Sequence, residues 1–360
     1  MRYLFIVQGE GRGHMTQAIT LSTMLRRNGH EVCEVLLAKC ENREIPSFFE
    51  ARIGAPIQVY DTPCFLYSKN KKRVNITKSL FYNMTPKRVA KYLKSMEFIH
   101  QRIEELKPDV VINFYELLAG LSNLRYRDEA PTITIGHQYL MKHPDYEHGK
   151  GDDQGILFLR IHALMCGLGA TKTLALSFYP MRDVYKEHLA VVPPLLRDEV
   201  LQLSPTKGDY ILGYMLNHGY AEEVSEWSKQ HPDKELHFFW DKPDEPESVT
   251  LTPSLTMHAI NDQQFIEYMA GCGGYITTAG FESVCEAMYL EKPLMLIPAH
   301  CEQEVNAKDA VAVYGGAIAE SFDIDRLLEQ MDSKKTHSGE FREWVLKAED
   351  IFLKHLTTLI

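Results

Sequence analysis

Short apolar runs alternate along this chain with longer segments in which apolar residues recur every three or four positions. In the first half, we expect strands over 3–7, 31–37, 56–60, 109–114, 132–136 and 172–177. Helices fit between most of these strands, including a long one over 86–106 that Pro108 ends. Parallel strands need helical crossovers, so this alternation predicts an α/β fold with a doubly wound parallel sheet.

A proline pair, Pro193 and Pro194, interrupts the alternation, because proline cannot continue a regular element. A second series follows it, with strands expected over 210–216, 236–240, 255–260, 273–277, 293–298 and 316–320. At 360 residues the chain exceeds what one core usually holds. We therefore expect two Rossmann-like domains, 1–192 and 193–340, hinged at the prolines, and a terminal helix over 341–360 that packs back toward the first domain.

Charge, apolar runs and cysteines exclude several classes of protein. The net charge of −10 argues against nucleic-acid binding, and no apolar run approaches the ~18 residues of a spanning helix. The start of the chain lacks the features of a signal peptide. The seven cysteines are odd in number and contain no C-x-x-C pair, so we expect reduced thiols, no zinc knuckle and a cytoplasmic location.

The stretch GEGRGH, residues 9–14, follows the first expected strand and opens the first expected helix. Gly9 and Gly11 fit the dinucleotide fingerprint G-x-G-x-x-G, but His14 stands where the third glycine belongs. The second strand ends in Ala38 and Lys39 instead of the acidic residue that binds ribose. A histidine at a strand end is placed to act as a base; the alternative is a histidine that only caps the helix.

A second group of polar residues follows two later strands. Thr278 and Gly280 end one strand, and the next helix carries Ser283 and Glu286 on one face. The helix after the following strand begins with Glu302, Gln303 and Asn306. Helix N-termini suit a diphosphate and a carboxylate suits a ribose diol. Each residue taken singly also has a structural explanation, such as acidic groups that complement a helix dipole.

The segment TAGFESVCEAMYLEKPLMLIP…EQEVNA resembles the donor-site signature of GT-B glycosyltransferases. The likeness is to the branch that contains the lipid II N-acetylglucosaminyltransferase and the UDP-glycosyltransferases, and GEGRGH resembles the turn that opens their first domain. The resemblance implies two Rossmann-like domains that face a central cleft. The first would be the acceptor-side domain and the second would bind the nucleotide-sugar.

The resemblance also assigns roles by position. Glu286 would hold the ribose hydroxyls, Ser283 would lie by the diphosphate, and Glu302 and Gln303 would bind the donor sugar. Further phosphate or donor contacts would come from Gly11, Gly13, Thr278, Gly280, Asn306 and a second loop with Asn217 and Gly219. The base would pass near Ile260 and Phe265. Apart from the resemblance, we expect Arg12, His137 and Gln138 on the acceptor side, because His137 and Gln138 end another strand at the same crevice; the alternative is a histidine that only supports the site. The chain departs from the lipid II enzyme at Thr278, where that enzyme has arginine, and it lacks the G-G-S-x-G loop in its usual place.

The activity so implied is an inverting, metal-independent glycosyl transfer of the hexosyltransferase type. A UDP-sugar would be the donor, His14 would deprotonate an acceptor hydroxyl, and no cofactor would be needed. A lipid-linked acceptor is one candidate. A sugar-nucleotide hydrolase, an epimerase on the same scaffold and a non-catalytic sugar-nucleotide-binding subunit remain as alternatives.

Residues 69–94 hold nine basic residues and no acidic one, with Phe81, Tyr82 and Met84 among them. The basic positions are Lys69, Lys71, Lys72, Arg73, Lys78, Lys87, Arg88, Lys91 and Lys94. Such a segment could bind anionic lipid headgroups while its aromatic residues insert, which would place the protein at the inner face of a membrane. The alternative is a solvated helical face.

Overall fold

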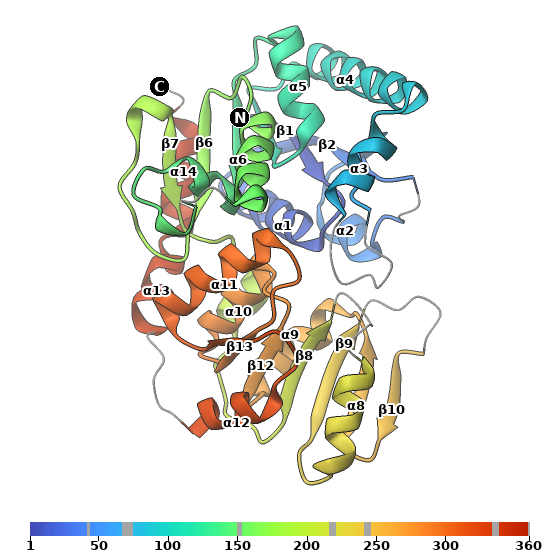
Figure 1. The fold of residues 1–360 in the computed structure, drawn as a ribbon. Helices are drawn as coiled ribbons and strands as arrows, with labels where there is room; N and C mark the ends of the chain where they lie inside the picture. The colour runs from blue at the N-terminus through green and yellow to red at the C-terminus, as the bar shows by residue number, and fades with distance from the viewer. Residues whose placement is uncertain are drawn as a thin grey trace. The chain divides into compact units, whose positions relative to one another are not determined.

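The computed structural model describes residues 1–41, 44–66, 75–149, 153–215, 221–240, 246–332 and 338–358. These residues form two compact units, each built on its own sheet (Figure 1). Unit 1 contains residues 1–66, 75–197 and 344–360, and unit 2 contains residues 198–343. The two α/β domains expected from the sequence are confirmed.

Unit 1 is built on a seven-stranded sheet in the order β3-β2-β1-β4-β5-β6-β7, and every neighbouring pair is parallel. Its strands are β1 (Arg2–Gln8), β2 (Glu31–Lys39), β3 (Ile57–Asp61), β4 (Val110–Phe114), β5 (Thr132–Gly136), β6 (Lys172–Leu176) and β7 (Leu189–Val192). Its helices are α1 (Arg12–Arg27), α2 (Ser47–Arg52), α3 (Ile76–Asn83), α4 (Pro86–Leu106), α5 (Leu117–Tyr126), α6 (Gln154–Cys166) and α14 (Ala348–Thr357). Three short 3-10 turns complete it: η1 (His137–Lys142), η2 (Glu147–Gly149) and η3 (Tyr185–Glu187).

Unit 2 holds a second seven-stranded sheet in the order β10-β11-β9-β8-β12-β13-β14. Its strands are β8 (Ile211–Met215), β9 (Leu236–Trp240), β10 (Ser248–Thr252), β11 (Leu255–Ala259), β12 (Gly274–Thr277), β13 (Leu294–Leu296) and β14 (Ala317–Ile318). Only the edge strand β10 is antiparallel to its neighbour. The helices are α7 (Asp198–Gln202), α8 (Ala221–Gln230), α9 (Asp262–Gly271), α10 (Phe281–Tyr289), α11 (Cys301–Tyr314), α12 (Ile324–Asp332) and α13 (Ser338–Leu346), which runs on into the first residues of the returning segment.

The central strands are apolar because both faces of each sheet are covered. In unit 1, α4 and α5 cover one face, where Met96 and Ile99 of α4 pack on Leu4 and Val111 of the sheet. In unit 2, β8 needs a glycine at Gly213, because a Cβ there would lie 2.0 Å from the ring of Phe238. The two cores are thus separate, one to each sheet.

The strand β7 and the edge strand β10 were not predicted. The sequence analysis placed a hinge at Pro193 and Pro194 and no strand before it, yet Leu189–Val192 pairs in parallel with β6. Four residues followed by prolines show too little alternation to indicate a strand. Strand β10 follows an acidic, proline-containing stretch that suggested only a turn.

The last segment of the chain belongs to unit 1 (Figure 1). The indole Nε1 of Trp344 donates to the Ser177 carbonyl oxygen at 3.0 Å, and Arg27 forms an ion pair with Glu349. Phe352 and Leu356 of α14 are fully buried. The segment is therefore part of the unit 1 core and not an appendage.

Cys40 and Cys64 form a disulfide, with their Cα atoms 5.7 Å apart. The expectation that every thiol is reduced is wrong at this pair. Cys40 directly follows β2 and Cys64 lies just beyond β3, and these parallel neighbours end side by side, with Lys39 opposite Asp61. Spacing along the sequence could not reveal this, because the contact depends on the pairing of the two strands.

One buried histidine should make unit 2 sensitive to acid. His258 stacks on Phe239, and its Nε2 lies 3.0 Å from Nδ1 of His237. Burial, and then the neighbouring His237, lowers the pKa of His258 to about 4. In the unfolded chain His258 takes up a proton near pH 6.5, whereas in the folded unit it stays neutral until about pH 4. The free energy of unfolding of unit 2 is therefore highest above pH 6.5 and falls as the pH drops toward 4. We expect unit 2 to lose on the order of 2 kcal/mol across this window.

Urea unfolding of the wild type and His258→Gln near neutral pH and in mild acid measures this loss. The variant should be less stable near neutral pH yet lose less on acidification. Equal losses in the two proteins would contradict the prediction.

Candidate functional site

Each sheet has a topological switch point, where ligands bind in folds of this kind. In unit 1 the chain runs from β1 outward to β3 and then returns to place β4 on the other side of β1. In unit 2 the corresponding pair is β8 and β12. The GEGRGH turn follows β1, and Thr278 to Gly280 follow β12, so both predicted groups lie at switch points.

The turn after β1 depends on Gly9. A Cβ at this position would lie 2.2 Å from the backbone oxygen of Ala38, at the end of β2. Gly11 is different, because a Cβ there would meet nothing within 4 Å. Gly11 is also the N-cap of α1, and no side chain caps that helix.

His14 lies within the first turn of α1 and is half-buried. It does not cap the helix, since Gly11 holds that position. Its Nδ1 lies 3.3 Å from Oε1 of Gln17, and its ring stacks on Tyr115 with centroids 5.6 Å apart. If Nδ1 carries the proton and donates to Gln17, Nε2 is the basic nitrogen.

Tyr115 directly follows β4 and has a backbone φ of 56°, in the left-handed region. Such a conformation in a bulky residue is costly and often marks a functional site. Here it places the ring against His14 and its hydroxyl 3.1 Å from Nδ1 of His162 on α6. The strained residue thus links the two histidines.

Aromatic rings pack around His162, and we call Phe65, Phe158 and Tyr115 the aromatic wall. Phe65 and Phe158 lie with His162 in ring contact at 5.8–6.4 Å between centroids, and the backbone N–H of Phe65 donates to the Glu10 carboxylate at 3.0 Å. Sequence analysis missed Tyr115, His162, Phe65 and Phe158. They come from three separate segments, with Phe158 and His162 both on α6, and none belongs to a motif.

Glu116, which directly follows Tyr115, is completely buried. It accepts hydrogen bonds from the Thr62 hydroxyl and the Ala119 amide, both at 2.7 Å. Burial raises the pKa of this carboxyl, while these hydrogen bonds oppose the rise. Because Glu116 caps α5 and fastens the segment after β3, its role is to hold the switch-point loops in position.

The predicted acceptor-side residues lie at two places in unit 1. The Arg12 guanidinium lies 5.3 Å from the centroid of the Phe48 ring. His137 and Gln138 are buried directly after β5. Nδ1 of His137 lies 2.8 Å from the carbonyl oxygen of Leu176, so β6 fixes the orientation of this imidazole.

In unit 2, the segment after β12 is held in an unusual conformation. Ala279 has a φ of 62° and is fully buried. Asn306 of α11 donates from Nδ2 to the Ala279 carbonyl oxygen at 3.3 Å. Gly280 then begins α10, and the Ser283 hydroxyl donates to its carbonyl oxygen at 3.3 Å. The β12–α10 turn is thus fastened to α11.

Five predicted donor-site side chains lie on these two helices: Ser283 and Glu286 on α10, and Glu302, Gln303 and Asn306 on α11. Glu286 is only 3 % exposed, two turns into α10. Gln303 accepts from the Ala299 N–H at 2.9 Å, which braces the β13–α11 turn, and Glu302 beside it is half-exposed. Gln303 and Asn306 therefore shape the backbone, while Thr278 is buried in the β12–α10 turn.

The remaining predicted positions lie in the core, at the start of a helix or outside the described residues. Phe265 packs in ring contact with Tyr214, Phe239 and Tyr275, so its ring belongs to the core. Ile260 is half-buried just before α9. Asn217 and Gly219 lie outside the described residues. Gly13 lies in the first turn of α1.

The basic segment is described only from residue 75 onward. There, Leu80, Phe81 and Met84 on and after α3 are exposed by 59 %, 74 % and 64 %. Arg88 and Lys91 of α4 pair with Glu41. Within the described part of the chain, no helix is both long and apolar enough to cross a bilayer.

Comparison with known proteins gives matches along nearly the whole chain. A family model described as glycosyl transferase family 1 matches residues 1–331. The chain is similar in structure to the glycotransferase of kitacinnamycin, with a TM-score of 0.65, 17 % identity and coverage of 98 % of this chain and 99 % of that one. It is also similar to the calicheamicin glycosyltransferase CalG4, with a TM-score of 0.65, 15 % identity and coverage of 100 % and 98 %. The spinosyn forosaminyltransferase SpnP matches with a TM-score of 0.59, 13 % identity and coverage of 100 % and 99 %. No curated protein matches the chain.

Proposed function

The chain belongs to glycosyl transferase family 1, and on that premise we propose that it transfers a sugar from a nucleoside diphosphate donor to an acceptor hydroxyl with inversion. UDP-sugar is the proposed donor. The GT-B fold, with its two Rossmann-like domains, supplies one half-site for the acceptor and one for the donor.

One observation in unit 2 supports the donor site above all. The helices α10 and α11 both begin at the carboxyl edge of the β12–β13 pair. A hydrogen bond from Asn306 of α11 to the Ala279 carbonyl oxygen joins α11 to the turn that precedes α10. Two helix N-termini at one edge favour a diphosphate without a catalytic metal. We assign Glu286 to the ribose hydroxyls, Ser283 to the diphosphate, and Glu302 with Gln303 to the sugar.

In unit 1 we assign His14 as the base. The stack on Tyr115 and the contact with Gln17 restrain the ring, and a restrained base needs less reorganisation during reaction. In the proposed step, the acceptor oxygen attacks the anomeric carbon as the bond to the diphosphate breaks, through an oxocarbenium-like state. His14 takes the acceptor proton, and the diphosphate leaves with the bonding electron pair.

The aromatic wall of Phe65, Phe158 and Tyr115 favours an acceptor with a large apolar part, since aromatic faces bind such groups well. A lipid-linked acceptor fits this description, as does an apolar small molecule. The exposed Leu80, Phe81 and Met84 support docking at an anionic membrane surface. We place the protein in the cytoplasm, at the inner face of a membrane when docked.

The test is a panel of UDP-, GDP-, dTDP- and ADP-sugars incubated with the protein and a library of hydroxyl-bearing apolar acceptors. We expect one nucleoside diphosphate to be released only with acceptor, together with a glycosylated product of inverted configuration in mass and NMR spectra. Release of the nucleoside diphosphate without acceptor would indicate a hydrolase. A sugar that changes configuration while still attached to its nucleotide would indicate an epimerase. Binding without any turnover would indicate a sugar-nucleotide-binding subunit.

A further inference from the structure

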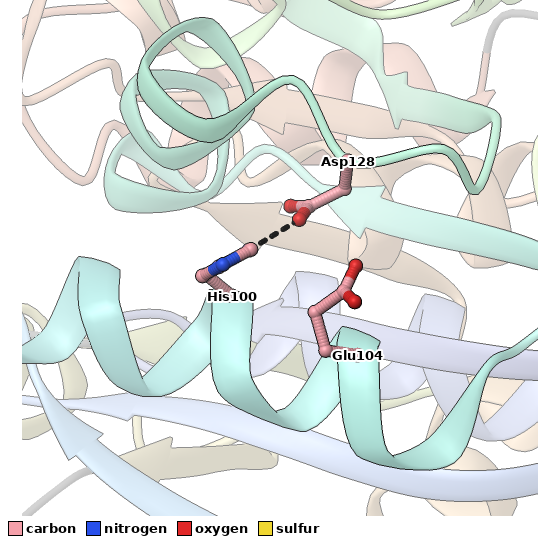
Figure 2. Close-up of side chains that lie close together, drawn as sticks. All are labelled: His100, Glu104 and Asp128. Atoms are coloured by element: carbon pink, nitrogen blue, oxygen red, sulfur yellow. Dashed lines mark hydrogen bonds and ion pairs between the residues drawn. The ribbon is translucent and has the colours of Figure 1, made fainter.

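A group of three metal-ligating side chains lies in unit 1, outside the site described above. His100 and Glu104 stand one turn apart on α4, and Asp128 lies in the connection between α5 and β5. Figure 2 shows the three side chains converging from these two segments. One ligand atom from each lies within 4.8 Å of the other two.

The imidazole of His100 is held in place from two sides. Its Nδ1 forms a hydrogen bond with Oδ1 of Asp128 (Figure 2). Its ring stacks on Tyr126 with centroids 4.3 Å apart and the planes 1° from parallel. A histidine restrained in this way presents one nitrogen in a fixed direction, as metal ligands do.

The buried carboxylate of Asp128 is a second feature that favours a bound cation. Its side chain is only 2 % exposed, and its Oδ2 has no hydrogen-bond partner among the described residues. The carboxylate of Glu104 lies close by, with one oxygen within 4.8 Å of the ligand atoms of His100 and Asp128. Two carboxylates opposite a single imidazole leave an excess of negative charge that a divalent cation would balance.

We propose that His100, Glu104 and Asp128 bind a divalent transition-metal ion of the zinc type. One imidazole nitrogen and two carboxylate oxygens match the ligand preference of Zn²⁺, and water would complete the tetrahedron. Ligand atoms around Zn²⁺ lie about 3.4 Å apart, so a small side-chain rotation of the exposed Glu104 closes the site. The ion binds Nδ1 of His100 and a carboxylate oxygen of Asp128 in place of the hydrogen bond between them, and the proton of that hydrogen bond is released to solvent.

The site lies at the amino ends of β4 and β5, since α4 leads into β4 and Asp128 precedes β5. The switch-point residues lie at the opposite, carboxyl edge of the same sheet. The ion therefore has no part in glycosyl transfer; it joins α4 to the α5–β5 connection and stabilises unit 1.

The experiment uses the full chain, freed of metal with EDTA and with the Cys40–Cys64 disulfide intact. Titration with Zn²⁺ against a chelating dye gives the affinity, and thermal unfolding gives the stabilisation. We expect one tight equivalent per chain, with a rise in Tm of roughly 5–10 °C at a hundredfold excess over Kd. His100→Ala and Glu104→Gln should each weaken binding at least about 100-fold.

The matched control is Glu97→Gln, an exposed glutamate on the same helix, which should bind Zn²⁺ as the wild type does. Glu104 is itself exposed, so its variant should fold, which a circular dichroism spectrum checks. Zinc binding that persists in both His100→Ala and Glu104→Gln would place the ion elsewhere, on thiols, and overturn the proposal. So would the absence of saturable binding in the wild type.

Discussion

Replacing His14 with alanine should lower kcat by about 10²–10⁴-fold, the contribution of a positioned general base. The nucleotide affinity should stay within about twofold, because the donor residues lie in unit 2. The pH profile of kcat should change as well. In the wild type, kcat should rise with pH as the imidazole loses its proton, and the variant should lose that rise. Steady-state turnover with the donor and acceptor from the panel measures both effects.

A matched control comes from His188, an exposed histidine before β7 at the opposite edge of the sheet. Its φ of 49° is one that asparagine tolerates, so His188→Asn should keep wild-type turnover. If His14→Ala retained full kcat and the wild-type pH profile, another group would be the base. His162 would then be tested next, because Tyr115 links it to His14.

Replacing Glu286 should reduce nucleoside diphosphate affinity by about 100-fold. A carboxylate that accepts from a ribose diol contributes charge-assisted hydrogen bonds of ~1.5–3 kcal/mol each, and 1.4 kcal/mol is a factor of ten. Saturating nucleotide should raise the Tm of the wild type by several degrees, about 2.7 kcal/mol at a hundredfold excess over Kd. Glu286→Ala should show almost no rise at the same concentration. Thermal shift with UDP, GDP, dTDP and ADP measures this and identifies the base.

Two further variants separate lost binding from lost folding. Glu286→Gln keeps the buried volume, so it should fold like the wild type yet still bind nucleotide weakly. Glu267→Ala removes an exposed glutamate from α9 of the same unit and should leave the thermal shift intact. A normal shift in Glu286→Gln would remove the ribose role from this residue.

The sequence was a good guide to the sheets and to the turns at their carboxyl edges. Buried parallel strands such as β4 and β12 are continuous apolar runs, and helices such as α4 carry clear periodicity and end at a proline. The GEGRGH turn also followed from local chemistry, because the need for Gly9 arises from the strand directly beside it.

Contacts between distant segments were beyond prediction from one sequence. Tyr115, Phe65 and His162 are separated by up to 97 positions and meet only because the sheet order places their loops together. The disulfide of Cys40 and Cys64 has the same origin in strand pairing. The packing of the Phe265 ring against Phe239 likewise depends on which strand and helix lie side by side.

The return of the chain to unit 1 has a consequence for the order of folding during synthesis. The described residues of unit 2 all fall within 198–343, whereas unit 1 lacks Trp344, Phe352 and Leu356 until that stretch has been made. The N-terminal domain commonly folds first. Here, by contrast, the N-terminal unit completes its core last, after unit 2 has been made. In the nascent unit 1, the surface of β6 and β7 that α14 covers in the folded protein is still exposed. It becomes buried only when α14 leaves the ribosome.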